Sequence, residues 1–227
     1  MRALITSVNC GDFLSSTLPA WKALIGDALG VATDASDVET LAVCARENVT
    51  AWVTDAWWRA DMSCHHGANP PKFNMALGLD EAFGFIPGLR AQPADGELCL
   101  SLNADVYPFG ELPKESSIPV GTMAGWWRYE CLTPSDLAAH VSGKRSVKTY
   151  TRMKNSGGRP VGYAQAFRYR PGFRFESYGS AGKYDVHVFA KFERLEMRDD
   201  LYLLHLGGPE GGHENWCGRC VPRWEAA

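Results

Sequence analysis

Residues 28–55, ALGVATDASDVETLAVCARENVTAWVTD, contain the pattern that decides the fold. The short apolar run 28–32 ends at a turn-forming Thr-Asp pair, which predicts a buried strand followed by a loop. Ser36 can cap the next helix, and Glu39 stands three residues later, as in a capping box. The inner face of that helix is expected to consist of Val38, Leu41, Ala42 and Ala45. The run 49–53 then predicts a second strand, which completes a strand–helix–strand unit.

The same alternation continues on both sides of this unit. The run 3–8 reads as another buried strand, and apolar residues recur at helical spacing between Phe13 and Ile25. Helical periodicity returns over 73–83, and 98–102 predicts a further strand. Alternating strands and helices are typical of an α/β fold with a mostly parallel sheet flanked by helices.

Polar residues follow four of the predicted strands. They are Asn9, Asp34, Asp55 and Asp105. In parallel α/β sheets, ligands bind beyond the carboxyl ends of the strands. The pattern therefore predicts a binding site at this edge, although any one of these residues could serve only as a turn or cap residue.

The composition excludes several classes of protein. The chain has 227 residues, 45% hydrophobic and 22% charged, with a formal net charge of −3, which argues against a disordered or fibrous chain. No run approaches the roughly 20 apolar residues of a membrane helix, and the first apolar run is too short for a secretion signal. We therefore expect a cytoplasmic protein, in a host cytoplasm if it is viral, with no membrane partner.

The seven cysteines are odd in number and scattered, which predicts reduced thiols. Cys217 and Cys220 have zinc-ligand spacing, and Cys64 with its neighbouring histidines could complete a site. A single Cys-x-x-Cys pair is weak support for zinc, so inert thiols are the expected state.

Charge is distributed unevenly along the chain. Residues 137–175 contain nine basic and no acidic residues, whereas the rest of the chain holds 26 acidic and 14 basic ones. Cations interleaved with aromatic rings are typical of surfaces that bind nucleic acid through phosphates and stacked bases. The candidate contact residues are Lys144, Arg145, Lys148, Arg152, Lys154, Arg168, Arg170 and Trp127. The alternative is a solvated basic face that binds nothing.

Several stretches, taken in order, resemble the GT-A glycosyltransferases, which use nucleotide-sugar donors. They are TDASDVET (33–40), TD (54–55), KFNMAL (72–77), LNADV (102–106), HLG (205–207) and NWCGR (215–219). Residues 108–175 show no such match. The resemblance implies a GT-A-like, Rossmann-type sheet with a basic insertion or extension in the middle of the chain.

The resemblance also implies roles for individual residues. The donor would be bound by Ser7, Asn9, Asp34, Asp55, Lys72, Asn74, Asn103, Ala104 and Asp105. Asn103-Ala104-Asp105 corresponds to the family's Asp-x-Asp motif, in which Asn103 replaces the first carboxylate. Asp105 would then bind Mn²⁺ or Mg²⁺ together with His205. A divalent ion neutralises the charge of a departing diphosphate, and hard oxygen ligands suit these ions.

An inverting transferase also needs a base for the acceptor hydroxyl. Asp185 follows a glycine-rich stretch and precedes an apolar run, where the family places its catalytic Asp or Glu. The same position is an ordinary helix N-cap. Glu176 and Glu193 are the reserve candidates, and a retaining reaction would need no such base.

Together these features predict a single GT-A-like domain. Residues 1–107 would bind the nucleotide sugar, 108–175 the acceptor, and 176–227 would supply the base and a metal ligand. The expected activity is metal-dependent transfer of a sugar, for example from a UDP-sugar, to a hydroxylated or hydroxymethylated pyrimidine of DNA such as 5-hydroxymethylcytosine. In this the chain resembles bacteriophage DNA-modifying transferases.

Two alternatives to DNA modification stay open at this stage. The chain could be a glycosyltransferase that acts on a surface glycan or protein, with the basic face serving an anionic partner. It could also be a non-catalytic nucleic-acid-binding protein on a degenerate transferase fold.

Overall fold

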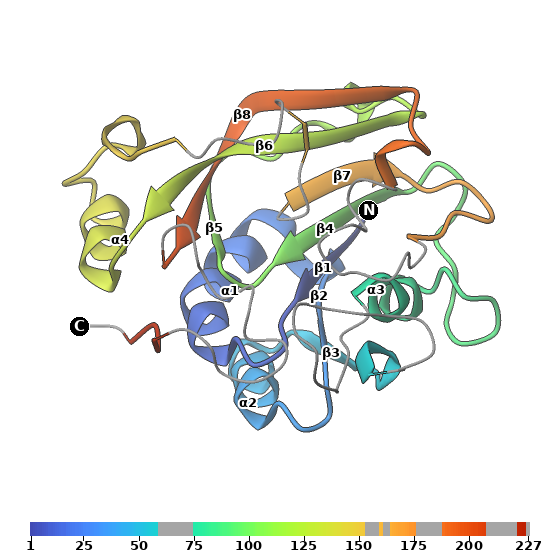
Figure 1. Ribbon diagram of the computed structural model, residues 1–227, viewed down its shortest axis with the longest axis horizontal. Helices are drawn as coiled ribbons and strands as arrows, with labels where there is room; N and C mark the ends of the chain where they lie inside the picture. The colour runs from blue at the N-terminus through green and yellow to red at the C-terminus, as the bar shows by residue number, and fades with distance from the viewer. Residues whose placement is uncertain (59–74, 153–158, 161–163, 176–187, 208–221, 226–227) are drawn as a thin grey trace, which may run out of the picture.

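The computed structural model describes residues 1–58, 75–152, 159–160, 164–175, 188–207 and 222–225. The strands among these residues form one sheet, in the order β3-β2-β1-β4-β7-β6-β8-β5 (Figure 1). Their bounds are β1 (Arg2–Thr6), β2 (Leu29–Thr33), β3 (Thr50–Val53), β4 (Leu98–Asn103), β5 (Val106–Gly110), β6 (Thr122–Cys131), β7 (Ala164–Arg168) and β8 (Arg194–Leu206). The described helices are α1 (Gly11–Ile25), α2 (Val38–Glu47), α3 (Met75–Phe83) and α4 (Pro134–Val141), with short 3₁₀ turns η1 (Gly26–Ala28), η2 (Ala56–Trp58), η3 (Glu115–Ser117) and η4 (Val147–Thr149).

The first half of the sheet confirms the predicted alternation of strands and helices. β1 pairs in parallel with β2 and β4, and β2 pairs in parallel with β3. Beyond β4 the sheet becomes mixed: β7 runs antiparallel to β4 and β6, and β5 antiparallel to β8, whereas β6 and β8 are parallel. The fold is therefore α/β, with parallel pairings in the majority.

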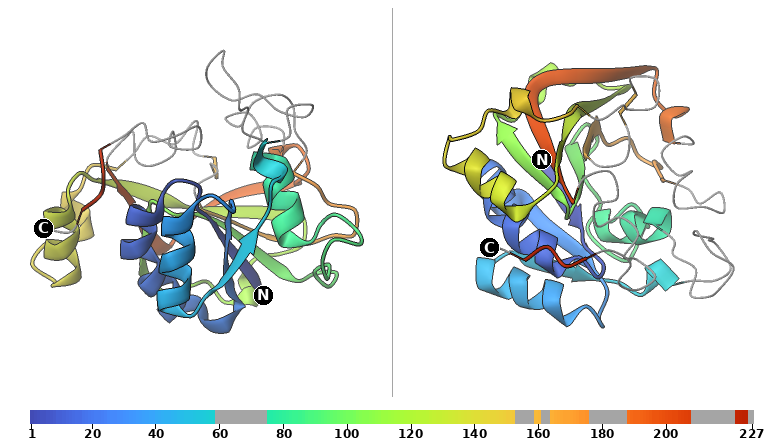
Figure 2. Two further views of the ribbon diagram at one scale, coloured as in Figure 1. Left: turned by 90° about the horizontal axis from the view of Figure 1, so that it is seen from below. Right: turned by 60° about the vertical axis from the view of Figure 1, so that its left-hand side comes forward.

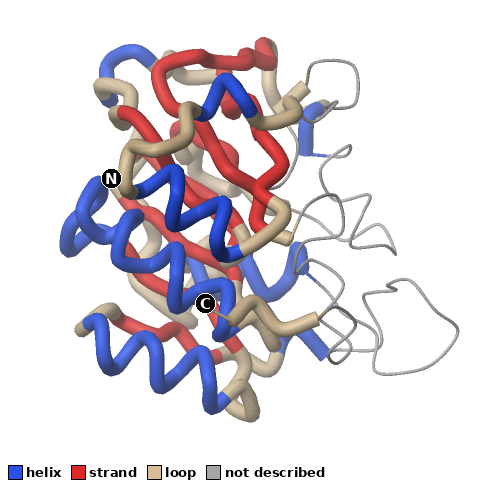
Figure 3. The backbone as a smooth tube through the Cα atoms, turned by 90° about the vertical axis from the view of Figure 1, so that its left-hand side faces the viewer, coloured by secondary structure: helices blue, strands red, loops and turns tan. Residues whose placement is uncertain are grey.

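Helices cover both faces of the sheet (Figures 2 and 3). Successive residues of a strand point to opposite faces, and β1 shows this directly. Ile5 belongs to the core cluster that contains Trp21 of α1, whereas Leu4 belongs to the cluster that contains Leu79 of α3. The sheet is thus the middle layer between two apolar cores. None of the helices in the described part of the chain has the length and apolar character needed to cross a membrane.

Helix α2 differs from the prediction in its start and in its buried face. Its N-cap is Asp37, not Ser36, because the Asp37 side chain accepts the backbone N–H of Thr40. Val38 is 73% exposed. The buried residues of α2 are Thr40, Val43 and Cys44. The other Asp37 oxygen accepts the backbone N–H of Asn9 at 2.7 Å, so a contact with the β1–α1 loop favours Asp37 as the cap.

The segment 108–175 is built into the sheet, where the sequence predicted an insertion or extension. It supplies β6 and β7, which lie in the interior of the sheet between β4 and β8. Phe167 of β7 packs against Phe83 of α3 and against Phe85. Part of the basic segment therefore belongs to the core.

The described cysteines have the predicted reduced state. Cys44, Cys99 and Cys131 are free thiols, and all three are buried, as is Cys10. Burial raises the pKa of Cys44 to about 11 and the pKa of Cys99 to about 12. The cysteines of the possible zinc site lie outside the described residues: Cys64, Cys217 and Cys220.

Candidate functional site

The carboxyl ends of β1 to β4 meet at one edge of the sheet. β1 lies between β2 and β4. The chain adds β2 and β3 on one side of β1 and then places β4 on the other side, so the strand order reverses at β1. Ligands of open α/β sheets bind next to such a reversal, beyond the carboxyl ends of the strands. The described residues expected to bind the donor stand at or just after these strand ends: Ser7, Asn9, Asp34, Asp55, Asn103, Ala104 and Asp105.

Asp105 lies in the tight turn between β4 and β5, and α1 holds this turn from one face of the sheet. The hydroxyl of Thr17 donates to the carbonyl of Ala104 at 2.7 Å. The indole N–H of Trp21 donates to the carbonyl of Val106, also at 2.7 Å. Neighbouring strands hold the turn through their backbones, with a β1 carbonyl 3.1 Å from the Ala104 nitrogen and a β8 amide 2.8 Å from the Asp105 carbonyl oxygen. The position of Asp105 is therefore fixed from several directions.

Asp105 contacts His205, although the two residues stand 100 positions apart in the sequence. Antiparallel pairing of β5 with β8 places Val106, the neighbour of Asp105, opposite His205. His205 Nε2 lies 3.3 Å from Asp105 Oδ2. The exposed fractions of the two residues are 0% and 2%. The two residues expected to bind a metal are thus adjacent and buried at the same edge.

This pair fits a divalent cation. Mn²⁺ accepts both carboxylate oxygen and imidazole nitrogen as ligands. Neighbouring ligands of an octahedral ion with bonds of about 2.1 Å lie about 3 Å apart, close to the separation of the two side chains. No third His, Cys, Asp or Glu joins the pair among the described residues. Because Mg²⁺ sites commonly combine one or two protein ligands with water and substrate phosphates, the pair suits an ion shared with a diphosphate.

Asp34 and Asn9 also have structural roles at this edge. Asp34 Oδ1 accepts hydrogen bonds from the backbone nitrogen and the hydroxyl of Ser36, at 2.8 and 2.5 Å, which shapes the turn before α2. Asn9 has a φ of 57°, a left-handed conformation that asparagine tolerates. Its backbone N–H donates to Asp37. Contacts of Asp34 or Asn9 with a donor would come in addition to these hydrogen bonds.

Asp37, Thr17 and Trp21 belong to this edge, and the sequence-based prediction did not include them. For Asp37 a local signal existed. Asp is a preferred N-cap residue, and its side chain can accept the backbone N–H three residues later, here that of Thr40. For Thr17 and Trp21 no local signal existed, because the carbonyl groups that accept their hydrogen bonds lie 87 and 85 residues later in the chain.

The predicted base lies outside the described residues, together with several other candidates. These residues are Lys72, Asn74, Lys154, Glu176 and Asp185. Glu193, the other reserve base, is exposed, and its carboxylate lies 3.3 Å from Arg170. It immediately precedes β8 and bonds to Gly121, nine residues before Glu130, the β6 partner of His205, so roughly 30 Å of β6 separates the two at the usual rise per residue. This separation argues against Glu193 as the base.

The described cations that were expected to contact nucleic acid fall into two groups. We call Lys144, Arg145, Lys148 and Arg152 the α4-end group, because they follow α4 (Figure 1). Arg152 forms a backbone bridge with Tyr129 of β6, and the next residue, Glu130, pairs with His205. Through Arg152, its last member along the chain, the α4-end group therefore comes near the edge that carries Asp105 and His205.

Two members of the α4-end group stack on aromatic rings. The guanidinium of Arg152 lies 4.4 Å from the centre of the Trp127 ring. The guanidinium of Arg145 lies 4.1 Å from the Tyr150 ring and forms an ion pair with Asp136. Lys144 and Lys148 are exposed. The two lysines are the members most available to an anionic partner.

Arg168 and Arg170 lie apart from the α4-end group. Arg168 pairs with Leu98, the first residue of β4, and so stands at the amino end of that strand. Its three guanidinium nitrogens donate to the backbone carbonyls of Gly96, Glu115 and Ile118. Arg170 lies 3.3 Å from Glu193. These candidate contact residues therefore do not form the single surface expected from the sequence, because Arg168 holds neighbouring loops at the far end of the sheet.

Comparison with the models of known protein families gave no match to this chain. Comparison with curated protein sequences gave no match either.

Proposed function

We propose that this protein is a metal-dependent glycosyltransferase of GT-A-like fold, which moves a sugar from a nucleotide-diphosphate donor to a hydroxyl group of nucleic acid. The observation that carries the proposal is the buried contact between Asp105 and His205. It lies at the carboxyl edge of the sheet, next to the reversal in strand order where α/β folds bind nucleotides.

The chemistry of this edge suits a nucleotide-diphosphate sugar. Asp34, Asp55 and Asn103 offer oxygen acceptors for the hydroxyls of a ribose and the polar edge of a base. A divalent ion bound by Asp105 and His205 would supply positive charge to a departing diphosphate. The hydrogen bonds around the β4–β5 turn keep Asp105 in place before any ligand binds, which lowers the cost of ordering the site.

Nucleic acid is the proposed acceptor because the α4-end group comes near the same edge at Arg152. Its exposed lysines suit phosphates, and the stacked Trp127 and Arg152 suit a base. A hydroxymethylated pyrimidine must leave a duplex to reach a buried site, and phosphate contacts would offset that cost. If the reaction inverts the configuration of the sugar, Asp185 is the proposed base that takes the proton from the acceptor hydroxyl.

The donor half of the proposal is tested by release of nucleoside diphosphate from a panel of UDP-sugars in the presence of Mn²⁺. Asp105→Asn is expected to reduce release at least a hundredfold, since it removes a metal-binding charge and keeps the shape of the side chain. Asp95→Asn is the matched control, because Asp95 is an exposed acid near the amino end of β4. Equal rates for the two variants would refute the role of Asp105.

The acceptor half is tested by the salt dependence of DNA binding. Lys144→Glu with Lys148→Glu is expected to weaken binding and to reduce the slope of log K against log salt by about 2. The control is Lys114→Glu with Arg194→Glu, which changes the net charge equally at residues away from the α4-end group. Equal affinities of the two double variants would favour the solvated-face alternative. Transfer itself is detected by mass spectrometry of nucleosides from modified and plain DNA.

A non-catalytic nucleic-acid-binding protein is the second candidate function. It is favoured by Asn103, which stands where the family has a carboxylate, and by the hydrogen bonds that engage Asp34 with Ser36. DNA binding that is unchanged in Asp105→Asn, with no diphosphate released from any donor, would support this candidate over the transferase.

A further inference from the structure

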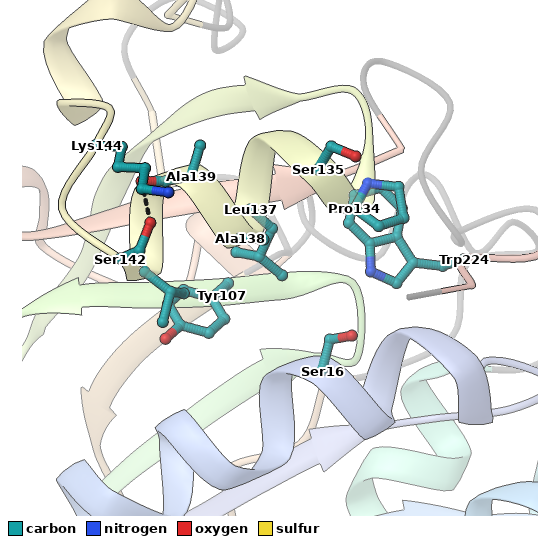
Figure 4. Close-up of a pocket in the computed structure, with 11 residues that line it drawn as sticks. Ser16, Tyr107, Pro134, Ser135, Leu137, Ala138, Ala139, Ser142, Lys144 and Trp224 are labelled. Carbon is teal, nitrogen blue, oxygen red and sulfur yellow. Dashed lines mark hydrogen bonds between the residues drawn. The ribbon is translucent and has the colours of Figure 1, made fainter. Parts of the chain in front are cut away.

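A cavity of about 730 Å³ lies between α4, α1, β5 and the described C-terminal residues (Figure 4). Figure 4 shows Leu137 and Ala138 of α4 between Tyr107 on one side and Trp224 on the other, with Ser16 of α1 below them. The volume is within the range of small-ligand sites, and such sites combine apolar walls with a few polar groups. We call this space the α1–α4 groove.

Trp224 brings a buried hydrogen-bond donor to the groove. Its ring stacks on Phe13 at 5.6 Å between centres, and its backbone N–H donates to Asp12 at 2.5 Å. The indole N–H is also buried, and no described residue accepts its hydrogen. Because a buried donor without an acceptor is unfavourable, this site favours a ligand that carries an acceptor atom. Nucleobases carry such atoms as ring nitrogens and carbonyl oxygens.

The charge of the groove is complementary to a nucleotide. Lys144 is the only charged side chain among the described residues that line it. The other members of the α4-end group follow directly along the chain. Aromatic rings, hydroxyls and one cation together suit a base attached to a phosphate.

The groove adjoins the candidate active site. Tyr107, which lines it, stands on β5, two residues after Asp105 of the preceding turn. Ser16, which also lines it, is next to Thr17, whose hydroxyl holds the turn that carries Asp105. A ligand in the groove would therefore lie beside the edge at which transfer is proposed, without occupying the edge itself.

We infer that the α1–α4 groove binds a base of the acceptor strand that neighbours the modified nucleotide, so that the acceptor is an oligonucleotide with unstacked bases and not a free nucleotide. This inference rests on the proposed function, since it assumes that the acceptor is nucleic acid. The groove would give the enzyme a second contact with the acceptor strand, at a base next to the nucleotide that reacts.

The test measures fluorescence anisotropy of dye-labelled single-stranded DNA, using a set of oligonucleotides that each carry one abasic position. The wild type is expected to lose about tenfold in affinity at one abasic position, as for the loss of one stacked base. Ala138→Trp fills the groove from an exposed position of α4, so it should bind intact DNA about tenfold more weakly and no longer respond to that abasic position. Ala42→Trp, at an exposed position of α2, is the matched control and should behave like the wild type.

A second variant, Trp224→Phe, keeps an aromatic ring against Phe13 and removes only the indole N–H. It should bind intact DNA several-fold more weakly and bind the abasic strand as the wild type does. Wild-type affinity in Ala138→Trp, or an abasic penalty that persists in it, would overturn the inference and leave the transferase proposal intact. Normal donor turnover without any DNA binding would overturn both the inference and the nucleic-acid acceptor. Groove-dependent DNA binding without turnover of any donor would overturn the transferase, and the inference with it because no nucleotide would then be modified, and would support the non-catalytic nucleic-acid-binding candidate.

Discussion

Replacing Thr17 by valine is expected to loosen the turn that carries Asp105. Thr17 is fully buried, and its hydroxyl donates to the Ala104 carbonyl at 2.7 Å. Valine has nearly the same shape and a similar helix propensity, so the substitution removes the hydroxyl donor and little else. Loss of a buried hydrogen bond to a carbonyl costs about 1–3 kcal/mol. A loss of about 2 kcal/mol corresponds to a melting temperature lower by about 4–8 °C in a chain of this length.

The same substitution is expected to weaken Mn²⁺ binding about 10–100-fold, since groups that orient a metal ligand commonly have effects of that size. Thermal unfolding and isothermal titration with Mn²⁺ check the two effects separately. Thr17→Ser is the control, because it keeps the hydroxyl and should retain nearly all of the metal affinity. A Thr17→Val protein that melts and binds Mn²⁺ like the wild type would refute the role given to this hydrogen bond.

Three further predictions concern packing and ionisation. A Cβ at Gly78 would lie 2.0 Å from Trp57 Cε3, so Gly78→Ala should lower the free energy of unfolding by about 1–3 kcal/mol despite the better helix propensity of alanine; an unchanged urea midpoint would contradict this. Burial lowers the pKa of His140 in the folded protein. As the pH falls below about 6.5, His140 is therefore protonated in the unfolded chain before it is protonated in the folded protein. The free energy of unfolding decreases over this range, until the pH passes the pKa of His140 in the folded protein. The urea midpoint of His140→Phe should therefore vary less between about pH 7 and pH 5, and equal variation would argue against a buried neutral imidazole. Burial raises the pKa of Cys99 to about 12, so its peptide should stay unlabelled by iodoacetamide in the native protein at neutral pH, and rapid labelling would show that the thiol is accessible.

Periodicity predicted the parallel half of the sheet because each strand there is a short apolar run between helical patterns. It did not predict β6, whose sequence TMAGWWRYEC does not alternate between apolar and polar residues. Most of β6 is buried, including Arg128, which is 5% exposed. A charged side chain inside a buried strand conceals the strand from any pattern based on hydrophobicity.

The candidate site was predictable as far as parallel strands determine it. Asn9, Asp34 and Asn103 had to reach one edge, because parallel strands end on the same side of a sheet. The partners of long side chains were not predictable. The sequence predicted that Arg168 is a surface cation that contacts nucleic acid. In the structure its guanidinium donates hydrogen bonds to backbone carbonyls 50 to 72 residues earlier in the chain. Charge patterning locates cations along a chain and does not show which of them the fold itself uses.

The meeting of Asp105 and His205 depends on an irregularity in β8. Trp126 and Arg128 are two residues apart on β6, whereas their partners Arg198 and Leu203 are five apart on β8, so β8 carries extra residues at this point. The indole N–H of Trp126 donates to Asp200, one of the residues between these partners, at 2.8 Å. Bulges of this kind re-aim the side chains that follow them.

Beyond the irregularity, β8 pairs with β5 so that His205 stands opposite Val106. A shift of one residue would turn His205 to the other face of the sheet, away from Asp105. Leucines on both sides of His205 are fully buried, so such a shift would also exchange side chains between two packed faces. The proposed metal site is therefore a consequence of strand register, and neither Asp105 nor His205 could form it if β8 lacked the extra residues.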